Sequence, residues 1–123
     1  MKKGSPGFQF AFKGIWHAIA TQFNFRIHLL IFMVVISAGL TLNISILEWC
    51  VILLASGSVL AAECANTAIE EIVNFISPEH NEKAGKIKDL AAASVLIVSF
   101  FAATIGLFIF LPKILLLCFL GHL

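Results

Sequence analysis

Three long apolar segments dominate the hydrophobic pattern of the chain, at residues 27–47, 49–75 and 90–111. Each has enough residues to cross a hydrocarbon core about 30 Å thick, because an α-helix rises about 1.5 Å per residue. The pattern therefore predicts three transmembrane helices. A short turn without Lys or Arg separates the first two, and a polar segment at residues 77–89 separates the second from the third.

The segments around these helices have different patterns. Residues 8–26 mix aromatic and aliphatic residues with single basic and polar ones, which predicts an amphipathic helix on the membrane surface. We expect the basic lead at residues 1–7 to be disordered. Ser77 and Pro78 have the character of an N-cap and a first helical residue, so they predict a new helix start. Residues 112–123 form an apolar tail too short to cross the membrane again.

The composition agrees with a membrane protein. Hydrophobic residues make up 60% of the chain and charged residues 12%, about half the charged share of a soluble domain. With a mean hydropathy of +1.02, the chain is predicted to be an all-α integral membrane protein with one membrane domain over residues 1–123. Its net charge of +1 gives no support for a nucleic-acid partner. Because so short a chain can hardly enclose a site alone, we expect a homo-oligomer.

Basic residues indicate the orientation in the membrane. They gather before the first span and between the second and third, at Lys2, Lys3, Lys13, Arg26, Lys83, Lys86 and Lys88. The positive-inside rule therefore places the N-terminus and residues 77–89 in the cytoplasm. From Trp49, Glu63 is about 20 Å and Glu70 about 30 Å along the helix, so both carboxylates are expected toward the cytoplasmic side.

The second span combines a polar face with a face of small residues. At about 100° per residue, one face collects Glu63, Asn66, Thr67, Glu70 and Asn74. The opposite face collects Gly57, Ala61, Ala65 and Ala68, which would let a neighbouring helix approach closely. Ionisable residues within a membrane span are costly and mark functional sites. Their oxygen atoms are ligands that Mg²⁺ prefers, so the polar face predicts a site for a divalent cation.

A basic and acidic pair, Lys88-Asp89, begins the third span on the same side of the membrane. Phosphoryl transfer needs a divalent cation, positive charge around the phosphates and a group that positions or deprotonates the acceptor hydroxyl. The chain offers these groups without a P-loop or a protein-kinase signature. Its four histidines share no zinc-ligand spacing.

Together these residues resemble a known family, the small bacterial integral-membrane lipid kinases, which comprise the diacylglycerol kinases and the undecaprenol kinases. The resemblance covers nearly the whole chain. It rests on three blocks, Phe10-x-x-Lys13-Gly14, Glu63-x-x-Asn66-x-Ala68-Ile69-Glu70 and Ala84-x-x-x-Lys88-Asp89. Asn24-Phe25-Arg26-Ile27-His28 is more similar to the undecaprenol kinases.

The resemblance implies a homotrimer in the bacterial cytoplasmic membrane that uses ATP and Mg²⁺ to phosphorylate a lipid alcohol, with sites shared between chains. It implies that Glu63 is the catalytic base and that Glu70 binds the metal. The nucleotide-binding residues that it implies are Phe10, Lys13, Asn66, Lys88 and Asp89.

Two positions depart from the family pattern, and two other functions stay open. Gln22 stands where the family usually has a metal-binding glutamate, and its neutral oxygen can ligate Mg²⁺ but donates no charge. Asn74 stands where an aspartate is common. The alternatives are a non-catalytic nucleotide- or metal-binding membrane protein and a small oligomeric ion pathway lined by carboxylates. Lys88-Asp89 favours the kinase over the ion pathway, because a pore needs no lysine to position phosphate.

Overall fold

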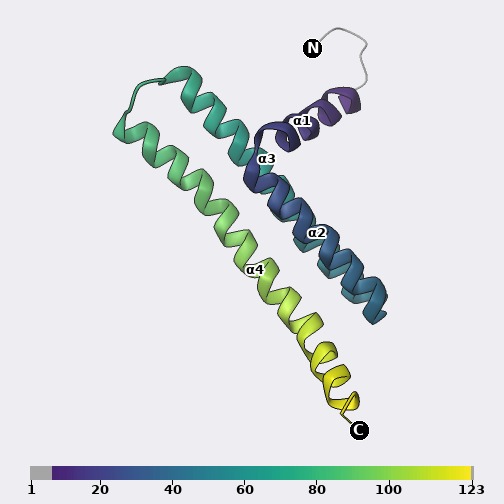
Figure 1. Ribbon diagram of the computed structural model, residues 1–123. Coiled ribbons are helices and arrows are strands. Elements are labelled where there is room, and N and C mark those ends of the chain that lie inside the picture. The colour runs from purple at the N-terminus through teal and green to yellow at the C-terminus, as the bar shows by residue number, and fades with distance from the viewer. Residues whose placement is uncertain (1–6, 123) are drawn as a thin grey trace.

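The computed structural model describes residues 7–122, which form four α-helices (Figure 1). They are α1 (Gly7–Thr21), α2 (Phe23–Leu42), α3 (Ile46–Ile76) and α4 (Glu82–Leu120). α2 and α3 run side by side in opposite directions, α4 returns along α3, and α1 lies obliquely near the start of α2 (Figure 1). Three helices, α2, α3 and α4, are long and apolar enough to cross a membrane, which confirms the predicted all-helical membrane architecture. The predicted lead at residues 1–7 lies outside the described residues except for Gly7.

A single extended residue, Gln22, separates α1 from α2. Its backbone angles are φ −110° and ψ 110°, its N–H donates to the carbonyl of Ala18, and its carbonyl accepts from the N–H of Arg26. The surface helix predicted at residues 8–26 is therefore too long, and its C-terminal part belongs to α2. The break lets α2 change direction and bury Phe25, which is 3% exposed.

The connection between α2 and α3 lies earlier in the chain than predicted. The first span, predicted at residues 27–47, ends at Leu42, because Asn43 adopts the left-handed conformation with φ 50°. A capping box then starts α3. Its Ser45 hydroxyl accepts from the N–H of Glu48 at 3.1 Å, and the Glu48 carboxylate accepts from the N–H of Ser45 at 3.0 Å.

This turn brings α2 and α3 into close contact at Gly39. A Cβ atom at this position would lie 2.6 Å from Cη2 of Trp49 and 3.1 Å from Cδ1 of Ile44. Any side chain here would therefore displace the indole ring.

We expect Gly39→Val to lower the free energy of unfolding by about 1–3 kcal/mol, the usual effect of overpacking. The thermal midpoint of the protein in detergent measures this effect. Gly14→Val is the matched control, because a Cβ at Gly14 meets no atom within 4 Å. Equal midpoints for the two variants would show that the contact with Trp49 is unimportant.

The start of α4 differs from the sequence-based prediction. Asn81, and not Ser77, is its N-cap, and the Asn81 side chain accepts from the backbone N–H groups of Lys83 at 2.9 Å and Ala84 at 3.3 Å. Ser77 is instead the C-cap of α3. Because Asn81 satisfies the first free N–H groups, helix formation begins there. Most of the loop predicted at residues 77–89 is therefore part of α4.

At its other end α4 continues to Leu120 and includes Pro112. The predicted tail at residues 112–123 is thus largely helical. Proline removes one N–H donor from a helix, but Pro112 does not end α4. Beyond it, Nζ of Lys113 lies 3.1 Å from Oε2 of Glu48. This ion pair joins the last part of α4 to the start of α3.

Few side chains are buried within the chain. The buried apolar residues are Ala18, Phe25, Ile44, Ile52, Ala55, Val59, Val73, Ala91 and Val95. Most large apolar side chains are exposed, as expected for helices that contact lipid or other chains. α3 has 31 residues and α2 has 20, so α3 extends about 17 Å beyond the start of α2. This projecting part carries Glu70 and Asn74.

Candidate functional site

Glu63 is buried where α3 passes the start of α2. Its side chain is 5% exposed, and its Oε1 lies 3.2 Å from Nε2 of His28, whose side chain is 23% exposed. A carboxylate is costly to bury unless a partner stabilises it. The fold therefore gives Glu63 a protected position with one polar partner from a different helix.

One turn further along α3, Asn66 and Glu70 lie next to each other. Nδ2 of Asn66 donates to Oε1 of Glu70 at 3.5 Å, the contact expected of residues four apart on a helix. Oδ1 of Asn66 is buried and has no hydrogen-bond partner. Because an unsatisfied buried acceptor costs free energy, this oxygen and the Glu70 carboxylate form a pair of acceptors suited to a ligand.

Lys88 of α4 lies against the same side of α3. Its ammonium group donates a hydrogen bond to Oδ1 of Asn74. Both residues line a small cleft of about 150 Å³ beside the connection between α3 and α4. Asp89 is exposed, and within residues 7–122 no hydrogen bond or ion pair joins its side chain to α3. The structure thus joins Lys88 to the polar face of α3 by a hydrogen bond, whereas the side chain of Asp89 is exposed and makes no such bond to α3.

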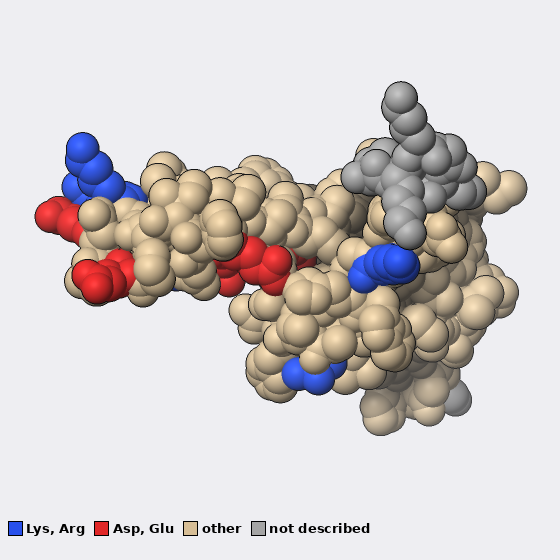
Figure 2. Space-filling view, turned by 90° about the horizontal axis from the view of Figure 1, so that it is seen from above, with Lys and Arg blue, Asp and Glu red and all other residues tan. Residues whose placement is uncertain are grey.

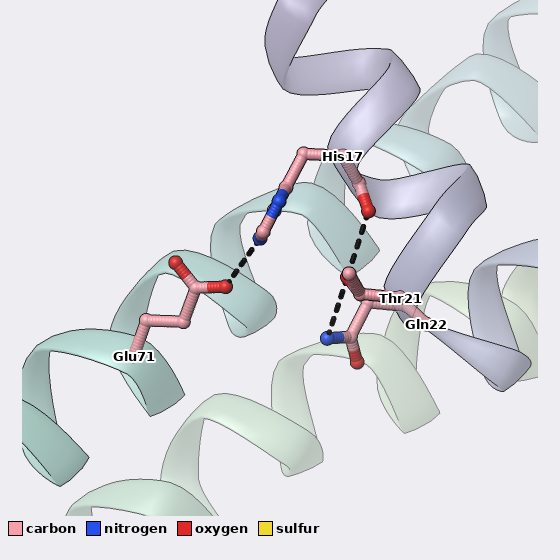
Figure 3. Close-up of polar contacts among 4 residues, drawn as sticks. All are labelled: His17, Thr21, Gln22 and Glu71. Atoms are coloured by element: carbon pink, nitrogen blue, oxygen red, sulfur yellow. Dashed lines mark hydrogen bonds and ion pairs between the residues drawn. The ribbon is translucent and has the colours of Figure 1, made fainter.

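α1 holds Phe10 and Lys13, and Nζ of Lys13 lies 5.7 Å from the centre of the Phe10 ring, within the range of a cation–π contact. α1 is joined to α3 by a different pair. Nε2 of His17 lies 2.6 Å from Oε1 of Glu71 (Figure 3). Figure 3 shows these two side chains pointing toward one another from the two helices. This contact places α1 beside the projecting part of α3.

The two predicted metal ligands, Gln22 and Glu70, make different hydrogen bonds in the structure. Nε2 of Gln22 donates to the hydroxyl of Thr21 at 3.3 Å (Figure 3), and no hydrogen bond joins Gln22 to Glu70 in the described part of the chain. Among residues 7–122, no group of three or more His, Cys, Asp and Glu side chains is arranged to hold a metal ion. A cation at this site would therefore need further ligands, such as phosphate oxygens, waters or another chain.

An apolar cavity of about 300 Å³ lies between α2, α3 and α4 and reaches His28. Its lining is made of His28, Ile31, Phe32, Val35, Ile52, Ser56, Val59, Ser99, Ala102, Ala103 and Gly106. Because His28 also contacts Glu63, this side chain belongs both to the cavity lining and to the surroundings of the buried carboxylate. The cavity can take a hydrocarbon chain whose polar end lies near Glu63.

Seen from above, charged side chains gather at the end formed by the connection between α3 and α4, and acidic ones also lie between that end and α1 (Figure 2). Most of the remaining visible surface carries no charge. His28 and His17 were not among the residues predicted for the site. A histidine within an otherwise apolar span was the available signal for His28. For His17, no pattern in the sequence indicated Glu71 as its partner.

Comparisons with known proteins agree on one family. The family model for prokaryotic diacylglycerol kinase matches residues 9–110, a range that includes every candidate site residue. The undecaprenol kinase of Bacillus subtilis is 38% identical over 107 residues, which is 87% of each chain. A diacylglycerol kinase of Synechocystis is 36% identical over 109 residues, which is 88% of this chain and 62% of that protein.

Proposed function

Because the chain belongs to the prokaryotic diacylglycerol kinase family, it is a membrane lipid kinase, and we propose that it transfers the γ-phosphoryl group of ATP to the hydroxyl of a lipid alcohol. The observation that carries this proposal is the position of Glu63, a buried carboxylate next to an apolar cavity that reaches His28. A lipid chain in this cavity brings its hydroxyl to the carboxylate. The reaction takes place at the cytoplasmic face of the bacterial cytoplasmic membrane.

Glu63 acts as the general base in this proposal. The proton of the lipid hydroxyl passes to the carboxylate, the lipid oxygen forms a bond to the γ-phosphorus, and the bond between that phosphorus and ADP breaks. Burial supports this role, because the side chain is 5% exposed and water is largely kept away from the acceptor.

Glu70 and Asn66 fit the Mg²⁺ that this reaction needs. Their side chains offer hard oxygen donors, and Oδ1 of Asn66 has no other partner. When bound, Mg²⁺ neutralises charge on the phosphates of the nucleotide. Lys88 and Asp89 bind or orient the phosphates from α4. On α1, Phe10 and Lys13 lie over the nucleotide.

Undecaprenol is the substrate that we favour over diacylglycerol. The relative named undecaprenol kinase shares 38% identity over 87% of its length. The segment at residues 24–28 also resembles that branch of the family. Transfer of labelled phosphate from ATP to each lipid tests the proposed function, and a folded protein that labels neither lipid would overturn it.

A homotrimer with shared sites is also part of this proposal. The face of α3 with Gly57, Ala61, Ala65 and Ala68 is exposed in the single chain. Its small side chains would let a neighbouring helix pack closely. A second chain could also supply the ligands that Glu70 lacks.

Gln22 provides a separate prediction. We expect Gln22→Glu to lower the Mg²⁺ concentration needed for half-maximal activity, because a carboxylate adds negative charge to the metal site. Titrating Mg²⁺ in the phosphorylation assay measures this effect. An unchanged Mg²⁺ dependence would place Gln22 outside the metal site, in line with its contact with Thr21.

A further inference from the structure

We propose that His28 is a positioning residue for Glu63, which holds one oxygen of the carboxylate so that the other faces the lipid hydroxyl. This inference rests on the proposed function. It concerns how the base is oriented, which no other side chain in the described structure accounts for.

The geometry of the two side chains is the first support. Nε2 of His28 lies 3.2 Å from Oε1 of Glu63, and the two groups come from different helices. Among residues 7–122 the other ion pairs join His17 to Glu71, Lys86 to Glu82 and Lys113 to Glu48. Within the described chain, the imidazole of His28 is thus the basic group that contacts Glu63.

The place of His28 in the apolar cavity is the second support. His28 is part of the cavity lining and also contacts the carboxylate. A lipid chain in the cavity therefore has its hydroxyl close to both groups. Because His28 occupies Oε1, the remaining oxygen, Oε2, is the one that receives the proton of the hydroxyl. The Nε2 proton of His28 stays on the imidazole throughout.

The role of such a contact is to reduce the conformations of a long, flexible side chain. A glutamate without a partner samples several rotamers, and most of them point its oxygens away from the lipid. A misplacement of about 1 Å can lower a rate about 100-fold. The imidazole of His28, fixed by α2, limits Glu63 to the productive arrangement.

Two substitutions of similar polarity, His28→Asn and His28→Gln, distinguish a role in orienting Glu63 from a role in packing alone. Glutamine places an amide N–H near the position of Nε2, whereas asparagine is shorter and does not reach Oε1 of Glu63. We expect His28→Asn to lower kcat by about 100-fold with an unchanged KM for ATP, because no hydrogen bond or ion pair joins His28 to Asn66, Glu70 or Lys88. His28→Gln should keep most of the wild-type kcat.

The contact itself is measured by the ¹⁵N resonance of His28 Nε2 in detergent micelles. We expect this resonance to shift in Glu63→Gln, which replaces the carboxylate next to Nε2 by an amide. An unshifted resonance, a fully active His28→Asn variant, or equal losses in the Asn and Gln variants would each overturn the positioning role. Wild-type protein without lipid phosphorylation would instead overturn the proposed function, so the two failures are distinguishable.

Discussion

Glu63→Gln is expected to lower phosphate transfer to lipid by about 100-fold to 10,000-fold, the usual contribution of a general base. The amide has almost the same shape as the carboxylate but cannot accept the proton of the lipid hydroxyl. Glu63 is buried beside His28 and is not one of the groups assigned to the nucleotide, so ATP binding should be largely unchanged. Initial rates with labelled ATP, together with ATP binding by calorimetry, measure the two effects.

Glu82→Gln is the matched control for this variant. It makes the same chemical change at an exposed carboxylate that pairs with Lys86 on the surface of α4, and exposed pairs of this kind stabilise little. Its rate should equal that of the wild-type protein. Undiminished transfer by Glu63→Gln would remove Glu63 from the role of base, whatever the effect at Glu82.

Glu70→Gln is expected to raise the Mg²⁺ concentration for half-maximal activity by at least about tenfold, since even groups outside the coordination shell cost that much when lost. The variant keeps an oxygen but loses the negative charge that attracts the cation. Excess Mg²⁺ should restore part of the activity. A titration of Mg²⁺ at saturating ATP measures both the shift and the recovery.

Glu71→Gln is the control for this second variant, because it removes a neighbouring carboxylate on the same helix. Glu71 contacts His17 of α1 and is exposed, so its loss should leave the Mg²⁺ dependence unchanged. The same Mg²⁺ shift in both variants would mean that the general negative charge of α3, and not Glu70, attracts the cation.

The polar face of α3 could be predicted from the sequence because it depends only on helix periodicity. Residues four apart lie next to each other on any α-helix, so the contact between Asn66 and Glu70 follows once α3 is known to be helical. The three long apolar helices could be predicted for a similar reason. Their length and hydropathy are local properties of the chain.

The helix ends could be predicted less accurately from the sequence, because several residues can act as the cap at each end. Ser77-Pro78 has the pattern of a helix start, but Asn81 is the N-cap that forms. Pro112 predicts a helix end, yet α4 continues through it, and the pair between Lys113 and Glu48 joins the continuation to α3. Such outcomes depend on contacts between distant segments.

The contact between His28 and Glu63 could not be predicted for the same reason. It requires the register in which α2 packs against α3, and that register depends on the Asn43 turn and the close approach at Gly39. The hydrogen bond of Gln22 with Thr21 likewise depends on the break between α1 and α2. Periodicity along one helix predicts neither the contact between His28 and Glu63 nor the position of Gln22.

The central claim is tested most directly by phosphate transfer from labelled ATP with purified protein in detergent micelles, supplied with undecaprenol and diacylglycerol in separate reactions. We expect Mg²⁺-dependent labelling of lipid that EDTA abolishes, with more product from undecaprenol than from diacylglycerol. A folded protein that binds ATP but labels neither lipid would contradict this account, and it would favour a non-catalytic nucleotide-binding protein.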